Sequence, residues 1–104
     1  VIYVPTDNTA ASNTEAIANV TVPAKTPVIA GEEGICKGCG VATLSISYYD
    51  LGMTTGKMAA KILTGEADIS TMPIEFTTAT PKYNASMCET LGITPLEGYT
   101  AIAE

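Results

Sequence analysis

Three short polar clusters supply the side chains that could contact a small molecule. They are Thr6, Asp7 and Asn8, then Glu32 and Glu33, and finally Ser47, Tyr48 and Tyr49. Carboxylates can pair with an ammonium group or accept from a hydroxyl, and tyrosine offers an apolar ring together with a hydroxyl. The clusters therefore suit a cleft that binds an amine or a hydroxyl.

Each cluster also has a purely structural interpretation. The triplet from Thr6 to Asn8 suits the start of a helix, where side-chain oxygens accept the free backbone N–H groups. The glutamates lie between Gly31 and Gly34 and could form a solvated loop, and tyrosines that enter a helix often pack. Paired carboxylates can also act in acid–base catalysis. Because the sequence has no histidine, no nucleophile elbow and no glycine-rich phosphate motif, we predict binding without catalytic residues, cofactor or metal ion.

Cys36 and Cys39 form a C-x-x-C pair, and Cys88 is the third cysteine. A thioredoxin-like site needs its first cysteine at a helix N-terminus, where the helix dipole lowers the thiol pKa. A structural zinc site needs four ligands, usually cysteine and histidine. The pair lies in an expected loop ahead of a strand, so we predict a loop disulfide or two free thiols.

The composition bounds the class of protein. The 104 residues are 46% hydrophobic and 15% charged, which is typical of one small globular domain. A net charge of −6 argues against nucleic acid and anionic membranes as partners. The sequence begins with Val1 inside an expected strand, so we expect a fragment or a processed product. The absence of a signal peptide then says nothing about the compartment.

The first two polar clusters follow two short apolar strands. Val1–Val4 runs into Pro5 without polar alternation, which is typical of a strand buried in a parallel sheet. A weakly amphipathic helix is expected over 10–20, and Pro27–Ala30 is the second strand, which completes a βαβ unit. Because ligands bind at the carboxyl ends of strands in open α/β sheets, both clusters lie where a cleft is expected.

The rest of the chain predicts five further segments. In order, they are a glycine-containing loop over 35–40, a strand over 41–47, a helix over 51–63, an edge strand over 72–77 and a helix over 84–91. The helix over 51–63 has apolar residues on one side and Lys57 and Lys61 on the other. Gly65 and Gly92 follow the two helices, as helix-terminating glycines do.

Taken together, these segments resemble a known family. The motifs that carry the resemblance are Ile2-Tyr3-Val4-Pro5-Thr6-Asp7-Asn8-Thr9, Pro27-Val28-Ile29-Ala30-Gly31-Glu32-Glu33-Gly34, Tyr48-Tyr49-Asp50-Leu51-Gly52 and Thr55–Leu63, with shorter matches at Gly65–Asp68, Met72-Pro73 and Leu91–Thr94. From Ile2 to about Thr94, the chain is similar to the carboxyl-terminal part of ABC transporter substrate-binding proteins. The characterised members bind tryptophan or related aromatic amino acids.

The resemblance implies a type I periplasmic-binding-protein fold, in which two α/β lobes joined by a hinge close around a solute. The chain would be an incomplete, parallel-sheet βαβ lobe. Residues 1–46 would form the latter half of the second lobe, and residues 47–104 the hinge crossover, a helix returning to the first lobe and the tail. All three polar clusters would then contact the ligand. The family usually has an acidic residue where this chain has Ser47 and a small residue where it has Cys39. The first difference leaves open whether Ser47 contacts the ligand, and the second indicates a local peculiarity of the loop.

The expected function is that of a solute-binding component of an ABC importer. An amino acid would bind with Asp7 or a glutamate on its ammonium group and an aromatic residue over its side chain. The protein would dock to a membrane permease and be extracytoplasmic, either periplasmic or a membrane-anchored lipoprotein. The fragment should self-associate as a dimer, because surfaces that a missing lobe normally covers would be exposed. The alternatives are the effector-binding domain of a sugar-repressor-like transcription regulator and a redox protein using Cys36 and Cys39.

Overall fold

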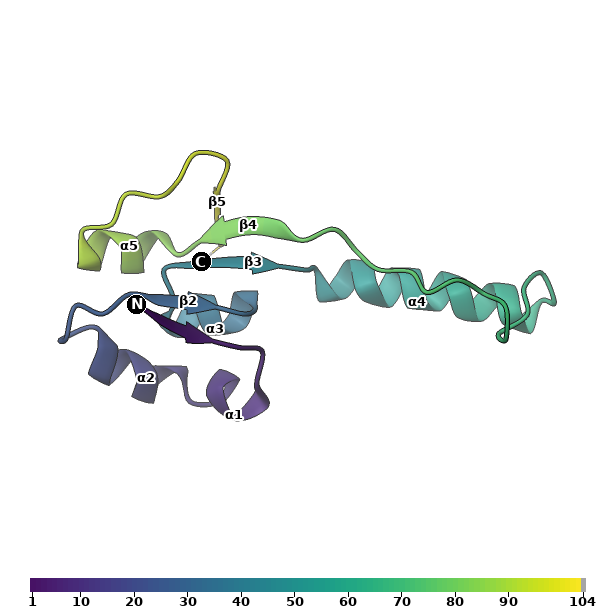
Figure 1. Cartoon of the computed structure of the whole chain (residues 1–104), viewed down its shortest axis with the longest axis horizontal. Coiled ribbons are helices and arrows are strands. Elements are labelled where there is room, and N and C mark those ends of the chain that lie inside the picture. The colour runs from purple at the N-terminus through teal and green to yellow at the C-terminus, as the bar shows by residue number, and fades with distance from the viewer. Residues whose placement is uncertain (104) are drawn as a thin grey trace. The chain divides into compact units, whose positions relative to one another are not determined.

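The structure is a computed structural model that describes residues 1–103 (Figure 1). Its elements, in chain order, are β1 (Ile2–Val4), α1 (Asn8–Ala11), α2 (Thr14–Thr21), β2 (Val28–Ala30), α3 (Glu33–Cys39), β3 (Ala42–Ser45), α4 (Tyr48–Leu63), β4 (Thr80–Tyr83), α5 (Ala85–Leu91) and β5 (Thr100–Ala101). They form two compact units. The first contains residues 1–45 and the chain from residue 80 onward, and the second contains residues 46–79. Within residues 1–103, no helix has the length and apolar character needed to cross a membrane.

The first unit is built on a five-stranded sheet with the strand order β1-β2-β3-β4-β5. Strands β1, β2 and β3 are parallel, β4 is antiparallel to β3, and β5 is parallel to β4. One row of partners crosses four strands, from Val4 through Ala30 and Thr43 to Lys82. The mixed α/β fold with a mostly parallel sheet confirms the fold class expected from the strand–helix–strand pattern.

The core of the first unit lies between α3 and one face of the sheet. Its buried members are Val28, Ala30, Ile35, Cys36 and Cys39, and the partly buried Val4, Ala10, Ile17, Ala18 and Ile102 pack against them. These residues come from β1, β2, α1, α2, α3 and the segment that follows β5, so the first three helices share one side of the sheet (Figure 1). Burial of this apolar surface is the main force that holds the unit together.

The opposite face of the sheet is less well covered. Tyr3, Ile29, Ala42 and Tyr83 lie in register across this face, and Tyr3 is 65% exposed. On β3, Leu44 points the same way as Ala42 and is 64% exposed. A pocket of about 180 Å³ forms beside Ile29, Ala42 and Tyr83, with the segment 88–99 as its other wall. An apolar sheet face therefore remains partly open to solvent.

The single helix expected over 10–20 is divided into α1 and α2. Ser12 Oγ donates to the Asn8 carbonyl oxygen at 2.9 Å, and Asn13 Nδ2 donates to the Thr9 carbonyl oxygen at 2.8 Å. Polar side chains that bond nearby carbonyls in this way compete with the helical backbone pattern. The helix therefore ends at Ala11 and restarts at Thr14.

The expected loop over 35–40 is wrong, because residues Glu33–Cys39 form the helix α3. The side chain of Glu32 caps its first turn, and Ile35, Cys36 and Cys39 are buried. Capping and burial together outweigh the low helix propensity of the two glycines in this segment.

The edge strand expected over 72–77 is also wrong. The second unit contains no strand, and β4 begins only at Thr80. Ile74 and Phe76 are instead exposed, at 91% and 86%. Alternation of apolar and polar residues predicts a strand only where a neighbouring strand can pair with it.

The helix ends follow the expected chemistry. Helix α4 begins at Tyr48, earlier than expected, because Ser47 Oγ accepts a hydrogen bond from the Asp50 amide at 3.1 Å. Gly65 follows α4 with a φ of 78°, and Gly92 ends α5 with a φ of 68°. Both lie in the left-handed region that glycine adopts without strain.

Candidate functional site

The loops that follow β1 and β2 lie side by side at the carboxyl edge of the parallel strands. The Gly31 amide donates to the Val4 carbonyl oxygen at 2.8 Å, and Thr6 Oγ1 donates to the Gly31 carbonyl oxygen at 3.2 Å. Parallel pairing of β1 with β2 puts these two loops at the same edge of the sheet, as the sequence predicts. The structure thus brings the first two polar clusters together.

Asp7 and Glu32 both cap helices at this edge. Asp7 Oδ1 accepts from the Ala10 amide at 2.8 Å at the start of α1. Glu32 Oε2 accepts from the Gly34 amide at 2.8 Å, and its Oε1 accepts from the Ile35 amide. Both oxygens of Glu32 are therefore used by α3, whereas one oxygen of Asp7 has no partner among residues 1–103.

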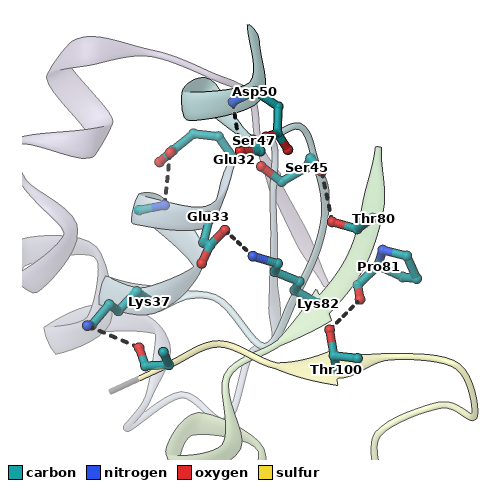
Figure 2. A network of polar contacts seen from close by, with 12 residues as sticks. Glu32, Glu33, Lys37, Ser45, Ser47, Asp50, Thr80, Pro81, Lys82 and Thr100 are labelled. Carbon is teal, nitrogen blue, oxygen red and sulfur yellow. Dashed lines mark hydrogen bonds and ion pairs between the residues drawn. The ribbon is translucent and has the colours of Figure 1, made fainter. Parts of the chain in front are cut away.

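Glu33 is held by a lysine from the far side of the sequence. Lys82 Nζ lies 2.6 Å from Glu33 Oε2, in an ion pair whose side chains are 29% and 37% exposed, respectively. Figure 2 shows Lys82 reaching from β4 to this carboxylate. The sequence alone did not identify Lys82 as a site residue, because it lies 49 positions from Glu33 and no short motif links the two.

The third polar cluster belongs to the second unit. Ser47 caps α4, and Tyr48 and Tyr49 follow in its first turn, with exposed rings. The tyrosines are thus available for contacts outside their own unit. Asn8, by comparison, is exposed at the start of α1 in the first unit.

The cysteines do not form a thiol-exchange site. Cys36, Cys39 and Cys88 are all free and buried, and Cys36 and Cys39 lie within α3. Burial, together with the nearby Cys88 and Cys39 thiols and the Glu33 and Glu32 carboxylates, raises the pKa of Cys36 to about 12. Burial also raises the pKa values of Cys39 and Cys88. A redox-active thiol needs the opposite, a lowered pKa and access to solvent.

The described residues contain no group of three or more His, Cys, Asp or Glu side chains that could hold a metal ion. A larger groove of about 430 Å³ lies within the second unit, lined by Lys57, Lys61, Glu66 and Glu75 among others. It shares no residue with the three polar clusters.

A mostly parallel α/β sheet with polar loops at its carboxyl edge is the arrangement in which many α/β proteins bind small molecules. Comparison with known proteins narrows this class to one family. Residues 1–104 match the family described as ABC transporter substrate binding protein, so the chain belongs to that family. Its members are substrate-binding proteins, and this assignment confirms the resemblance seen in the sequence motifs.

Individual relatives bind aromatic amino acids. A protein named tyrosine-binding protein, from Clostridioides difficile (strain R20291), is 37% identical over 67 residues. The structure of an ABC domain in complex with L-Trp, from Streptococcus pneumonia, superposes with a TM-score of 0.81 at 31% identity. The ligand-free, open structure of a substrate-binding protein with adhesive properties, from Clostridium difficile, gives a TM-score of 0.74 at 34% identity.

The chain corresponds to only part of each relative. The match to the tyrosine-binding protein covers 64% of this chain and 19% of that protein. The two solved structures are matched by 97% and 96% of this chain, which correspond to 36% and 35% of their own chains. The chain thus spans about a third of the length of the solved relatives.

Proposed function

We propose that this chain is part of the extracytoplasmic solute-binding component of an ABC importer that takes up an aromatic amino acid. The observation that carries the proposal is the pair of relatives that bind tyrosine and L-Trp, at 37% and 31% identity. The polar loops at the carboxyl edge of β1 and β2 agree with it, because they offer oxygens where ligands of α/β sheets bind. Import would require docking to a membrane permease.

The ligand-binding residues in this proposal are Thr6, Asp7, Asn8, Glu32, Glu33, Ser47, Tyr48 and Tyr49. Asp7 is the best partner for the ammonium group, since one of its oxygens is unused by the protein. Glu32 and Glu33 are already bonded, to backbone amides and to Lys82. A charge-assisted hydrogen bond to Asp7 would orient the amino acid, and a tyrosine ring from Tyr48 or Tyr49 would cover its side chain.

The resemblance to the family implies how the cleft would be divided. We place residues 1–46 in the second lobe and assign the crossover and α4, within residues 47–104, to the hinge and the first lobe. The strands β3 and β4 carry the chain out of the sheet unit and back into it, with Ser45 paired to Thr80. The solute would be trapped between the lobes when they close about this double connection.

The test is ligand binding by the full-length protein. Isothermal titration calorimetry with L-tryptophan, L-tyrosine and L-phenylalanine should show saturable binding, with L-lysine and L-leucine as controls. Asp7→Asn should weaken the affinity at least tenfold, because the charge opposite the ammonium is lost. A protein that gives no heat of binding and no ligand-dependent rise in melting temperature with any amino acid would refute the proposal.

The localisation has its own test. An extracytoplasmic protein, whether periplasmic or anchored as a lipoprotein, is accessible to protease or to a membrane-impermeant label in intact cells or spheroplasts. Recovery of the protein only after lysis would contradict this part of the proposal.

We also propose that the 104-residue chain alone forms a dimer. The exposed Tyr3, Ile29 and Leu44 lie on one face of the sheet, and an apolar face of this kind favours association. Light scattering on the purified chain should give twice the monomer mass at high concentration. A monomer mass at every concentration would overturn the dimer and leave the ligand-binding proposal intact.

A further inference from the structure

The ion pair between Lys82 and Glu33 joins two segments that are 49 residues apart. Glu33 is the first residue of α3 and directly follows its capping residue Glu32, at the carboxyl edge of β2. Lys82 lies on β4, opposite Thr43 of β3. Both side chains are on the side of the sheet that α3 covers, because the row of partners containing Lys82 also contains the buried Ala30 (Figure 2).

Strand β4 has a particular place in the chain. It begins at Thr80, where the chain returns to the sheet unit after residues 46–79. Thr80 is paired with Ser45, where the chain leaves that unit. Lys82 is two residues beyond the return point. The ion pair therefore joins Glu33 to strand β4 within the first unit.

The neighbouring contacts leave Glu33 dependent on this lysine. Glu32 is fixed by the amides of Gly34 and Ile35, so its position follows from α3 alone. Among residues 1–103, the Glu33 carboxylate pairs only with Lys82. Loss of the ammonium group would leave the Glu33 carboxylate free to turn toward a bound solute or toward solvent.

We propose that Lys82 is a positioning residue for the aromatic amino-acid site, which acts by holding Glu33 against strand β4. Lys82 itself does not touch the solute. It fixes the orientation of the Glu33 side chain relative to strand β4, which is paired with β3 in the first unit. This inference rests on the proposed function, since it concerns the same site.

The expected effect is moderate. A partly exposed ion pair contributes little in water, so its loss should weaken amino-acid binding by about fivefold and should not abolish it. The difference in affinity between the wild-type protein and the Lys82 variants should shrink as salt is added, because salt screens the Lys82–Glu33 ion pair of the wild-type protein.

The experiment is a double-mutant cycle in the full-length protein, with affinity for L-tryptophan and L-tyrosine measured by titration calorimetry. Lys82→Met should weaken binding by about fivefold in the wild-type background but by less than about twofold in a Glu33→Gln background, because the lysine acts through the Glu33 carboxylate. Lys82→Met keeps the aliphatic stem of lysine, and Glu33→Gln keeps the shape of the glutamate side chain. Lys57→Glu, an exposed lysine on α4 with no partner among residues 1–103, is the matched control and should bind as wild type.

The outcomes separate the two proposals. If the wild-type protein binds neither amino acid, the proposed function fails and the role of Lys82 falls with it. If the wild type binds and the Lys82 variants bind equally well, only the role of Lys82 is overturned. Variants with a lower melting temperature but unchanged affinity would make the ion pair a stability contact and would likewise overturn the inference. A fivefold loss from Lys82→Met that persists in the Glu33→Gln background would also overturn it.

Discussion

Gly31 and Thr6 are in closer contact than any side chain at position 31 would allow. A Cβ atom on Gly31 would lie 2.6 Å from the Thr6 amide nitrogen and 2.9 Å from the Pro5 carbonyl carbon. Both of these are backbone atoms, which cannot rotate away. The close approach is what lets Thr6 Oγ1 reach the Gly31 carbonyl oxygen and brings the first two polar loops together.

Replacing Gly31 by alanine should push these loops apart. We expect Gly31→Ala to lower the free energy of unfolding by about 1–3 kcal/mol, since an added methyl group here must displace backbone. In the full-length protein it should also weaken aromatic amino-acid binding by more than tenfold. Urea denaturation and titration calorimetry measure the two effects. Gly56→Ala is the control, because a Cβ there meets nothing within 4 Å and alanine favours a helix; equal behaviour of the two variants would contradict the prediction.

The capping role of Glu32 can be tested separately from ligand binding. Glu32→Ala removes the acceptors for the Gly34 and Ile35 amides and should cost about 1 kcal/mol in the free energy of unfolding. Glu32→Asp should cost less than half as much, because aspartate is a preferred N-cap residue. Urea denaturation of the ligand-free protein distinguishes them. If the alanine variant is as stable as wild type, the cap does not stabilise α3.

The strands of the parallel sheet could be predicted because their signal is local. Val28–Ala30 is an unbroken apolar run, and the neighbouring strand Ile2–Val4 also consists of apolar and aromatic residues only. Helix α3 carried no such signal, since Gly34 and Gly38 both lower helix propensity. Gly38 is nevertheless needed, because a Cβ there would lie 2.2 Å from Thr14 Oγ1 on α2. The helix is specified by its packing against another helix, which sequence spacing does not show.

The candidate site was predictable to a similar extent. The polar residues after β1 and β2 could be placed at one edge of the sheet because parallel pairing requires it. The side chains that pair with these polar residues could not be predicted from the sequence. Lys82 meets Glu33 only because β4 returns to lie beside β3, and the alternation at 72–77 pointed to a different segment as the strand.

Asn84 is predicted to be the most sensitive polar residue in the first unit. It is buried, and its Nδ2 donates to the carbonyl oxygens of Cys36 at 3.0 Å and Lys37 at 2.9 Å, near the end of α3. Its Oδ1 also accepts from the Met87 amide and so caps α5. Asn84→Ala leaves the Lys37 carbonyl oxygen and the Met87 amide without these partners and removes one of the two donors to the Cys36 carbonyl oxygen, so it should cost about 2–3 kcal/mol in the free energy of unfolding.

The matched control for Asn84 is Asn84→Asp. Aspartate keeps the cap on α5 but cannot donate to the α3 carbonyls when ionised, so it should be destabilising at neutral pH and recover part of the loss as the pH falls and the carboxyl group is protonated. Thermal denaturation at pH 4 and pH 7 measures this difference. An aspartate variant as stable as wild type at pH 7 would mean that the contacts with α3 contribute nothing.

The buried thiols predict a loss of stability in alkaline solution. The pKa of Cys36 is raised from its ordinary value of 9.0 to about 12 in the folded protein, chiefly by burial. A group whose folded pKa is raised contributes stability in full below its unfolded pKa and loses that contribution as the pH rises toward the folded value. The free energy of unfolding should therefore fall between about pH 9 and pH 12, with Cys36 contributing up to about 1.4 kcal/mol per pH unit.

Cys36→Ser provides the comparison, because serine does not titrate in this range and every other titratable residue is the same in both proteins. The variant should be less stable at pH 7, yet its stability should decline less steeply above pH 9. Thiolate absorbance near 240 nm should show no Cys36 ionisation below pH 10 in the native protein, and a disulfide-exchange reagent should react with all three thiols only after unfolding. Rapid reaction of a native thiol at pH 8, or identical alkaline slopes for the two proteins, would show that Cys36 is not held as a buried neutral thiol.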